Sequence, residues 1–339
     1  MAKSIEVLTT IPFPESVMQR LREVTPHLHI TMHPAEKADE IAMDLWNRTE
    51  ILYTDIVVPE AEAVPNLRWI QYHYAGVDFL LDTPLPEKKD LQITTMSGAS
   101  AIQEGEYILG MLLGLGHHFA ELFQNQLKHD WPTDRWEKFS PRELTNATVG
   151  IIGYGSIGRE VARLLQPFNC KILATKRDAM NPVDTGYNIE GHGDPEGNLF
   201  HRLYPIQALK AMIKECDFVI MLLPLTAQTR GIYDEEVIRA MKPGSFLVVA
   251  SRGGIVDESA LYQALSEHAL AGAALDVFSR EPFPAENPLW KLPNVIMTPH
   301  VSGFSPNYKE RAGMMFAENL ERYLHGERLL NKWDPERSY

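Results

Sequence analysis

The chain of 339 residues has little cysteine, no excess of basic charge and no long hydrophobic run. Its two cysteines, Cys170 and Cys216, each adjoin an apolar stretch, which favours small buried side chains over a disulfide or a nucleophile. Lys and Arg number 32 against 45 Asp and Glu, and no Lys/Arg-rich run occurs, so a nucleic-acid partner is not expected. The apolar run 107–116 is too short to span a bilayer and the N-terminus lacks a signal core. These absences predict a cytoplasmic protein with no membrane partner.

The length exceeds one ordinary domain and suits two. The first hundred residues alternate short apolar runs with an amphipathic helical pattern at 14–24, which predicts parallel β/α units. The stretch 97–127 is expected to form one long helix, with Ser100 as N-cap and Gln103 three residues later. The strands expected before that helix are 5–10, 29–33, 50–54, 67–71 and 91–95.

A second β/α series begins near Thr148 and has the size of a dinucleotide-binding fold. Its expected strands are 149–153, 170–175, 216–223, 244–251, 271–278 and 294–299, and its helices 157–165, 206–214, 234–240 and 258–267. The amphipathic helix 307–327 lies beyond the last strand and is expected to pack back on the first domain. The predicted fold is therefore α/β, with two doubly wound parallel-sheet domains: 1–101 with 301–339, enclosing 102–300.

The segment 178–205 is rich in Gly, Pro, Asn and Asp and has no clear period. It is longer than most connections between elements. A plain surface insertion is the favoured interpretation. The alternatives are that the segment covers the adenosine end of a cofactor or reaches a partner subunit.

A dinucleotide motif, "GYGSIG", follows the apolar strand and opens a helix. Gly153 would make the tight turn, Gly155 would let a pyrophosphate approach the backbone, and Gly158 would let the helix lie close to the strand. The helix N-terminus offers N–H groups and partial positive charge to phosphates. The predicted cofactor-binding residues of this stretch are Gly153, Tyr154, Gly155, Ser156, Ile157 and Gly158.

The second strand ends where an acidic residue commonly reads the ribose, about 20 residues further on. This chain has Thr175, Lys176 and Arg177 there instead. A hydroxyl and two cations suit a 2′-phosphate, which Arg can bind through two parallel hydrogen bonds. The pattern favours NADP(H) over NAD(H). Two alternatives remain open: the cations are only solvated surface charge, or Asp178 supplies the missing acid.

Three polar residues follow three successive predicted strands, namely Arg252, Glu281 and His300. Ligands of open α/β sheets bind outside the carboxyl ends of strands, so these side chains can meet beside a nicotinamide. Arg252 can hold a carboxylate and polarise an adjacent carbonyl. His300 can give a proton to the developing alkoxide, while Glu281 bonds the other imidazole nitrogen and favours the protonated ring.

At these residues the sequence resembles the D-isomer-specific 2-hydroxyacid dehydrogenase family. The matching blocks cover most of the chain in the family's order: "GIIGYGSIG", "LPLTAQTRG", "SRGGIVDESALYQAL", "AGAALDVFSREP" and "TPHVSG". The resemblance implies a Rossmann domain inserted into a flavodoxin-like substrate domain. It also implies that Arg252 binds substrate, that His300 is the acid/base, and that Glu281 is its partner.

The resemblance places further residues around the ligands. "YHYAGVDFL" looks like the family's substrate-carboxylate loop, with backbone N–H groups of Ala75, Gly76 and Val77 facing the acid. Enzymes of this family are commonly homodimers through the nucleotide domain, and the helix from Ala101 is the expected contact. No metal is expected. The residues implied at the nicotinamide and ribose pocket are Leu223, Pro224, Thr229, Ala250, Ser251 and Asp276.

The chain departs from the family pattern at several positions. Val249 stands where Asn is frequent, His117 stands where Arg is frequent, and the loop after Arg177 is longer than typical. The basic residues at the ribose position resemble those of the family's NADP-preferring glyoxylate/hydroxypyruvate reductases. Glyoxylate or hydroxypyruvate is therefore the first expectation for the substrate.

Two other functions remain open. A dinucleotide-sensing corepressor-like binding protein would share the fold, although the short predicted tails do not favour it. A phosphite-type dehydrogenase would keep the enzyme and change the substrate. Five aromatic residues either shape the substrate pocket or serve as core and interface residues: Tyr72, His73, Tyr74, Trp131 and Trp136.

Overall fold

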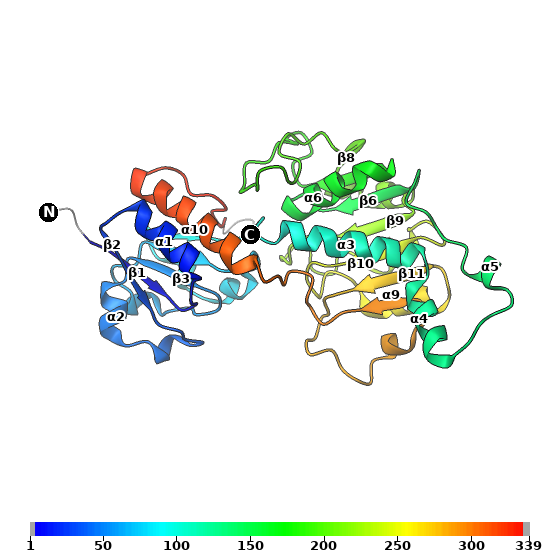
Figure 1. Cartoon of the computed structure of the whole chain (residues 1–339), viewed down its shortest axis with the longest axis horizontal. Helices are drawn as coiled ribbons and strands as arrows, with labels where there is room; N and C mark the ends of the chain where they lie inside the picture. Colours follow the sequence, from blue (N-terminus) through cyan, green and yellow to red (C-terminus); the bar gives the residue numbers. More distant parts are fainter. Residues whose placement is uncertain (1–3, 335–339) are drawn as a thin grey trace. The chain divides into compact units, whose positions relative to one another are not determined.

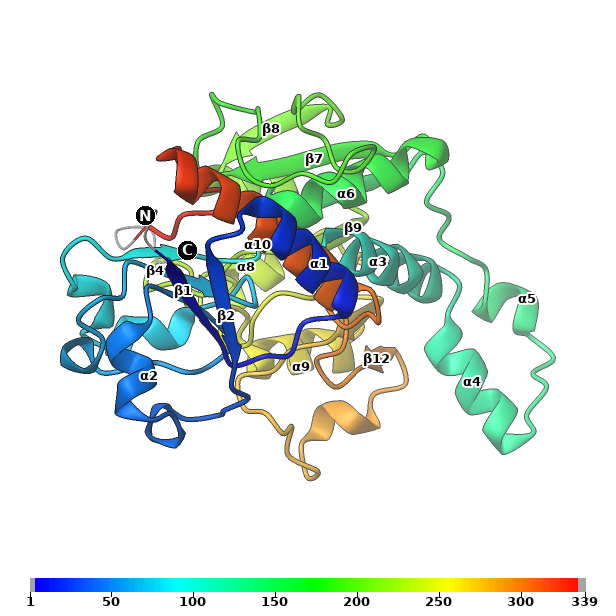
Figure 2. The same ribbon diagram turned by 60° about the vertical axis from the view of Figure 1, so that its left-hand side comes forward.

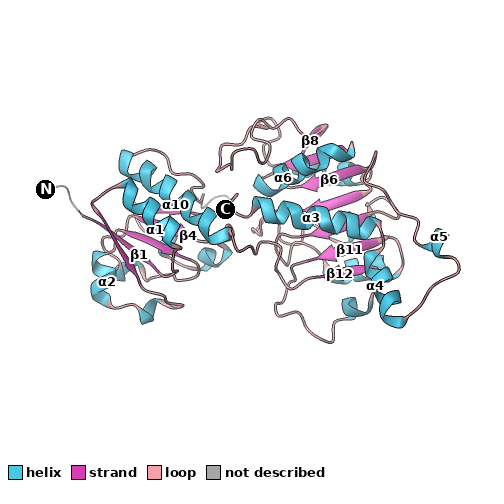
Figure 3. Cartoon of the chain, viewed as in Figure 1, coloured by secondary structure: helices cyan, strands magenta, loops and turns pink. Residues whose placement is uncertain are grey.

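The computed structural model describes residues 4–334, which form two compact α/β units (Figure 1). Unit 1 comprises residues 4–100 and 305–334, and unit 2 comprises Ala101–Phe304. The chain thus leaves unit 1 once and returns to it. In each unit helices and strands alternate along the chain, as the colouring in Figure 3 shows.

Unit 1 has a five-stranded parallel sheet in the order β2-β1-β3-β4-β5. This is the flavodoxin-like order, and the strand order reverses between β1 and β3. All five strands predicted for this unit are present. The elements are β1 (Ile5–Thr9), α1 (Glu15–Val24), β2 (Leu28–Met32), α2 (Met43–Arg48), β3 (Ile51–Thr54), β4 (Trp69–Tyr72), β5 (Gln92–Thr94) and α10 (Tyr308–His325).

The C-terminal helix α10 packs beside α1, and Figures 1 and 2 both show the two helices side by side. The close approach is possible because α10 has Gly313 at the crossing. A Cβ at Gly313 would lie 2.5 Å from both Cγ atoms of Val17. This contact ties the end of the chain to the first helix of unit 1.

Unit 2 has a seven-stranded parallel sheet in the order β12-β11-β10-β9-β6-β7-β8. The chain reverses direction across the sheet between β6 and β9, which is the switch point of a Rossmann fold. The predicted class, two doubly wound parallel-sheet domains, is confirmed. The strands are β6 (Thr148–Ile152), β7 (Lys171–Lys176), β8 (Arg202–Pro205), β9 (Phe218–Met221), β10 (Phe246–Val249), β11 (Gly272–Leu275) and β12 (Val295–Met297).

Helices cover both faces of this sheet because successive side chains of each buried strand point to opposite sides. Ile151 and Val248 pack on one face with α3 and α6, whereas Ile152 and Leu247 pack on the other with α7, α8 and α9. The helices of unit 2 are α3 (Ala101–Gly116), α4 (Phe119–Lys128), α5 (Arg135–Lys138), α6 (Ser156–Leu165), α7 (Leu209–Ile213), α8 (Glu235–Arg239) and α9 (Glu258–Ser266).

Two sequence predictions for unit 2 are wrong. The expected single helix 97–127 is two helices, because His118 adopts a left-handed conformation with φ 58° between α3 and α4. Gly116 ends α3 against another segment, where its carbonyl accepts from Arg142 N and a Cβ would lie 2.5 Å from Arg142 O. The segment 178–205 is also not loop throughout, since it ends in the parallel edge strand β8.

Candidate active site

Arg252, Glu281 and His300 follow β10, β11 and β12, three neighbouring strands of the unit 2 sheet. Because the strands are parallel, all three residues lie at the same carboxyl edge of the sheet. His300 Nδ1 lies 2.8 Å from Glu281 Oε2. Glu281 Oε1 accepts a hydrogen bond from Phe278 N at 3.0 Å, which fixes the carboxylate against its own loop. The predicted histidine–glutamate pair is therefore formed.

The turn after Arg252 packs against the loop that carries Glu281. A Cβ at Gly253 would lie 1.9 Å from Phe278 O, so only glycine permits this approach of two backbone segments. One guanidinium N–H of Arg252 donates to Ser251 O at 2.8 Å. Gly253 thus brings the Arg252 turn to the same loop whose Phe278 N–H holds Glu281. The sequence shows the pair "GG" directly after Arg252, but it does not show which segment packs against Gly253.

Asp276, at the end of β11, organises the loop that carries His300. The carboxylate is fully buried and accepts from Thr298 Oγ1 at 2.6 Å, Val301 N at 2.9 Å and Ser302 N at 3.0 Å. Its backbone carbonyl accepts from His300 N at 2.8 Å. His300 itself has φ 53°, an uncommon conformation for a non-glycine residue. Both carboxylate oxygens of Asp276, which is predicted to line the nicotinamide pocket, therefore accept hydrogen bonds from the His300 loop.

Tyr107 of α3 extends this network. Its hydroxyl lies 2.6 Å from Thr298 Oγ1, which in turn donates to Asp276. Burial, the largest cause, raises the pKa of Tyr107 to about 12, and the Asp276 charge acts in the same direction. Tyr107 therefore stays protonated at neutral pH and supports the loop as a neutral hydroxyl.

The dinucleotide motif forms the turn between β6 and α6. Gly153 has φ 104°, and a Cβ there would lie 2.9 Å from Leu222 O. A Cβ at Gly158 would lie 2.6 Å from Gly153 O and 2.9 Å from Ile151 Cγ2, which confirms the predicted close approach of helix to strand. At Gly155, by contrast, a Cβ would meet nothing within 4 Å. Packing therefore does not require that glycine, and the open space fits a phosphate approaching the first turn of α6.

The predicted ribose-end residues lie together at the end of β7 but in different surroundings. Thr175 is fully buried, and its hydroxyl accepts from Gly153 N at 3.1 Å. Lys176 Nζ donates to Asn181 O and, at 3.3 Å, to Val183 O. Arg177 is exposed. The Asp178 carboxylate accepts from Met180 N and from the Asn181 side chain, the latter bond being the main cause that lowers the pKa of Asp178.

The other predicted nicotinamide-pocket residues lie after β9 and β10. Leu223 and Ala250 are buried. Thr229 Oγ1 donates to Pro224 O at 2.5 Å and accepts from Thr226 N at 2.8 Å, so its hydroxyl holds the shape of this turn. Ser251 Oγ is buried and has no hydrogen-bond partner in the described part of the chain. An unpartnered hydroxyl at the carboxyl end of β10 fits a site for a polar ligand group.

The predicted carboxylate loop belongs to unit 1, where it follows β4. Ala75 and Gly76 are half-buried and Val77 is buried. His73, just before this loop, is held by two tyrosines: its carbonyl accepts from Tyr308 OH, and its Nδ1 lies 2.6 Å from Tyr53 OH.

The aromatic residues left open by the sequence have different surroundings. Tyr72 and His73 are buried and Tyr74 is partly exposed, whereas Trp131 and Trp136 are about four-fifths exposed near α4 and α5 of unit 2. Tyr72 and His73 are thus core residues of unit 1, and the two tryptophans lie on the surface of unit 2.

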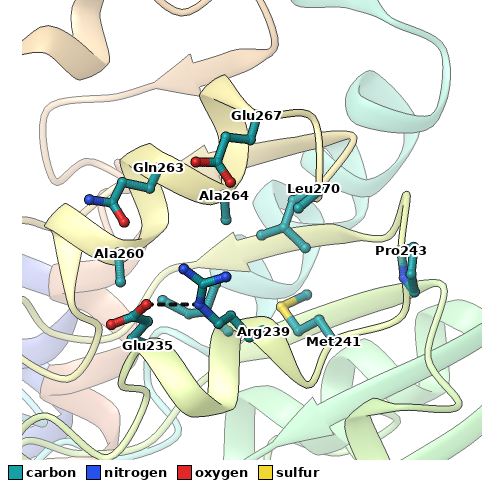
Figure 4. A pocket seen from close by; sticks show the side chains of 11 residues that line it. Glu235, Arg239, Met241, Pro243, Ala260, Gln263, Ala264, Glu267 and Leu270 are labelled. Carbon is teal, nitrogen blue, oxygen red and sulfur yellow. Dashed lines mark hydrogen bonds and ion pairs between the residues drawn. The ribbon is translucent and has the colours of Figure 1, made fainter.

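A cavity of about 100 Å³ lies between α8 and α9 (Figure 4). Met241 and Pro243 precede β10, and Ala269 and Leu270 precede β11, so the cavity belongs to the amino edge of the sheet. It is therefore at the opposite edge from Arg252 and His300. Within residues 4–334 no three His, Cys, Asp or Glu side chains lie together as a metal site would require. In the same range no helix is long and apolar enough to cross a bilayer.

Known proteins are similar to this chain in sequence and in fold. The family model "D-isomer specific 2-hydroxyacid dehydrogenase, NAD binding domain" matches residues 109–302, more than half of the chain. A glyoxylate reductase of Thermofilum pendens is 30% identical over 330 residues, covering 95% of this chain and 92% of that protein. A hydroxypyruvate reductase of Thermotoga maritima is 32% identical over 307 residues, covering 88% and 91%.

A solved structure of an NADPH-dependent glyoxylate/hydroxypyruvate reductase from Sinorhizobium meliloti, in complex with NADP and sulfate, has a TM-score of 0.76. It is 25% identical and covers 99% of this chain and 100% of that one. The chain belongs to the D-isomer specific 2-hydroxyacid dehydrogenase family and is an NAD(P)-dependent oxidoreductase.

Proposed function

We propose that this protein reduces a small 2-keto acid, with glyoxylate or hydroxypyruvate as first candidates, to the corresponding 2-hydroxy acid, the D isomer where C2 becomes chiral. The observation that carries the proposal is the pairing of His300 with Glu281. These two residues follow β12 and β11, and Arg252 follows β10, the next strand of the sheet. Relatives named glyoxylate reductase and hydroxypyruvate reductase, at 30% and 32% identity, support this substrate class.

Each residue has a role that follows from its geometry. The guanidinium of Arg252, anchored at Ser251 O, would bind the substrate carboxylate and polarise the neighbouring carbonyl. Because a carboxylate can only accept, the Glu281 contact assigns a proton to His300 Nδ1. A protonated His300 would then donate from Nε2 to the carbonyl oxygen as it gains negative charge. The dinucleotide, when bound, supplies the hydride that goes to C2.

The loop of Ala75, Gly76 and Val77 would bind the same class of anion through backbone N–H groups. This role is carried by the loop's position after β4, at the carboxyl edge of the unit 1 sheet, where ligands of such sheets bind. Backbone N–H groups at such an edge can bind a carboxylate without a charged side chain.

We further propose NADP(H) as the preferred cofactor, with residues of the GYGSIG turn at the pyrophosphate and Arg177 as the principal contact of a 2′-phosphate. Arg177 is favoured within the basic pair because it is exposed and because a guanidinium can bind a phosphate through two parallel hydrogen bonds. The NADP-bound relative from Sinorhizobium meliloti supports this choice.

A homodimer through unit 2 is also proposed. Helices α4 and α5 project from the sheet of unit 2 (Figure 1) and carry apolar side chains that water would otherwise cover. These exposed residues are Phe119, Leu122, Phe123 and Leu127 of α4 and Trp136 of α5, and Trp131 lies between the two helices. Four of them fall within the helix from Ala101 that the sequence predicts as the contact, and we propose α4 and α5 as the dimer surface. Light scattering of the purified protein would measure its mass. The cytoplasmic location remains a prediction.

The function is tested by initial rates of nicotinamide oxidation by the purified protein. NADPH and NADH are each combined with glyoxylate, hydroxypyruvate, pyruvate and bulkier 2-keto acids. Turnover with NADPH exceeding that with NADH is expected. Tight dinucleotide binding without turnover of any keto acid would instead favour a sensing protein, and NAD(P)+ reduction by phosphite would favour the phosphite-type enzyme.

A further inference from the structure

The connection between β7 and β8, residues 177–201, stands where a doubly wound unit has its second crossover helix. We call it the 177–201 coil, because these residues, all of them described, form no helix or strand. It is the loop beside β8 in Figures 1 and 3. It leaves the sheet at the carboxyl end of β7, where a dinucleotide fold reads the ribose of the adenosine.

Arg159, in the first turn of α6, holds the coil from inside the unit. Its side chain is 1% exposed. Nη1 donates to Asp194 O and Nη2 to Pro182 O, both at 2.5 Å, and Nε lies 3.4 Å from Asp184 Oδ2. All three partners belong to the coil. A buried cation needs such partners, so Arg159 and the coil depend on each other's position.

Tyr154, between the first two glycines of the dinucleotide motif, forms a second link. Its hydroxyl donates to Asp194 Oδ2 at 2.6 Å, and its ring lies under the Arg159 guanidinium at 4.9 Å. Asp194 is buried and also accepts from Asn198 N and Leu199 N, each at 3.1 Å. Tyr154, a residue of the phosphate turn, is thus bonded directly to a buried residue of the coil.

Two further links fix the coil at other points. Glu160, next to Arg159, accepts from Gly193 N at 2.7 Å and lies 3.1 Å from His192 Nδ1. Lys176 donates to carbonyls near the start of the coil. The coil also folds on itself, since a Cβ at Gly197 would lie 2.3 Å from Pro182 O. A plain surface insertion would not require these buried charges and backbone contacts.

We propose that the 177–201 coil is a fixed wall of the adenosine end of the dinucleotide site, and that Arg159 and Tyr154 are the positioning residues that hold it there. The coil begins at the ribose position and is bonded to the phosphate turn, so its links set the distance between these two parts of the site. The ligand chemistry it serves is an adenosine nucleotide. This inference rests on the dinucleotide binding of the proposed function but not on its keto-acid substrate.

The test uses the full chain and two probes of the adenosine end alone: 5′-AMP and adenosine 2′,5′-bisphosphate. Calorimetry gives the dissociation constant of each probe, and hydrogen exchange with mass spectrometry gives the protection of the coil. Tyr154→Phe removes only the hydroxyl bond to Asp194, which keeps its two backbone donors. Arg159→Lys keeps the positive charge but replaces the guanidinium, whose two Nη atoms donate to Asp194 O and Pro182 O, by a single ammonium group. Arg239→Lys on α8 is the matched control, since Arg239 pairs with Glu235 away from the coil.

In both Tyr154→Phe and Arg159→Lys the coil is expected to exchange faster. The dissociation constants of both probes should rise together, by about threefold to tenfold for Tyr154→Phe and more for Arg159→Lys, since only the fraction of molecules with the wall in place binds well. The control should change neither quantity. Should Arg159→Lys fail to fold, Tyr154→Phe carries the test alone.

Three results would overturn the proposal. Faster exchange of the coil with unchanged dissociation constants would make the coil a surface insertion. Unchanged exchange in Tyr154→Phe would show that the links do not hold it. Absence of binding of either probe by the wild-type protein would remove the adenosine site itself. Normal probe binding without keto-acid turnover would leave this inference standing and overturn the proposed function instead.

Discussion

Replacing Asp276 by Asn probes how the catalytic histidine is held. The two residues have the same shape, but Asn has one acceptor oxygen and one NH2 group. One Asp276 oxygen serves Thr298 and Val301, and the other serves Ser302 N. In the better of the two amide orientations, the NH2 group faces Ser302 N–H. A buried pair of donors without an acceptor costs about 1–3 kcal/mol of the free energy of unfolding.

The cost should appear in catalysis as well, since His300 sits inside this loop and its N–H donates to Asp276 O. A displacement of about 1 Å of a catalytic group can lower turnover by about a hundredfold. We therefore expect Asp276→Asn to lower kcat by at least tenfold, within a range of about 10–100-fold. The dissociation constant for NADPH should stay within about threefold, because both carboxylate oxygens serve the loop.

Denaturant unfolding, fluorescence titration of NADPH and steady-state rates measure these quantities. Asp257→Asn is the matched control. Asp257 also accepts from two backbone N–H groups, of Ser259 and Ala260, but it caps a surface helix, where Asn is an equally good cap. The reasoning is refuted if Asp276→Asn turns over like the wild type, or if its only defect is loss of NADPH binding.

Three other changes test separate parts of the structure. Arg252→Ala should lower kcat/KM for hydroxypyruvate by at least about 10²-fold through loss of charged hydrogen bonds, with NADPH binding retained; a folded variant that no longer binds NADPH would contradict this role. Gly253→Ala should lower both kcat and stability, by about 1–3 kcal/mol for the latter, since its Cβ would overlap Phe278 O. Gly110→Ala, whose Cβ meets nothing within 4 Å, is the control, and equal effects of the two would be contrary evidence. Burial lowers the pKa of His73 to about 4, below the value of about 6.5 in an unfolded chain. The unfolded state then binds more protons between these values, so about 3 kcal/mol of stability present above pH 6.5 should be lost as the pH falls to 4; urea midpoints of wild type and His73→Gln measure it, and parallel pH profiles would count against the idea.

The parallel sheets and the order of the site residues could be predicted because local patterns specify them. Buried strands such as 149–153 are short apolar runs between glycine and polar residues, and the glycine motif has a fixed spacing. The pairing of Glu281 with His300 also followed from three strand ends that share one edge. These features depend on few residues that are close in sequence or repeat regularly.

What sequence could not provide depends on contacts between distant segments. The end of α3 is set by Gly116 against Arg142, and the run 97–127 alone has an unbroken helical pattern. Strand β8 was missed because Arg202–Pro205 is short and borders an irregular segment. Nothing in the sequence indicates that Arg159 is buried, because only the folded coil surrounds it. Nothing in the sequence shows that the two carboxylate oxygens of Asp276 accept hydrogen bonds from residues 298–302.

The most direct test of the account compares NADPH oxidation with hydroxypyruvate by the wild-type protein and by His300→Gln, after fluorescence titration has shown equal NADPH binding. Gln has the reach to keep contact with Glu281 but cannot donate a proton as an acid. The account predicts turnover by the wild type and a loss of about 10²–10⁴-fold in kcat for the variant, the usual contribution of general acid catalysis. Comparable turnover by both proteins would contradict the assignment of His300 as the proton donor and, with it, the proposed active site.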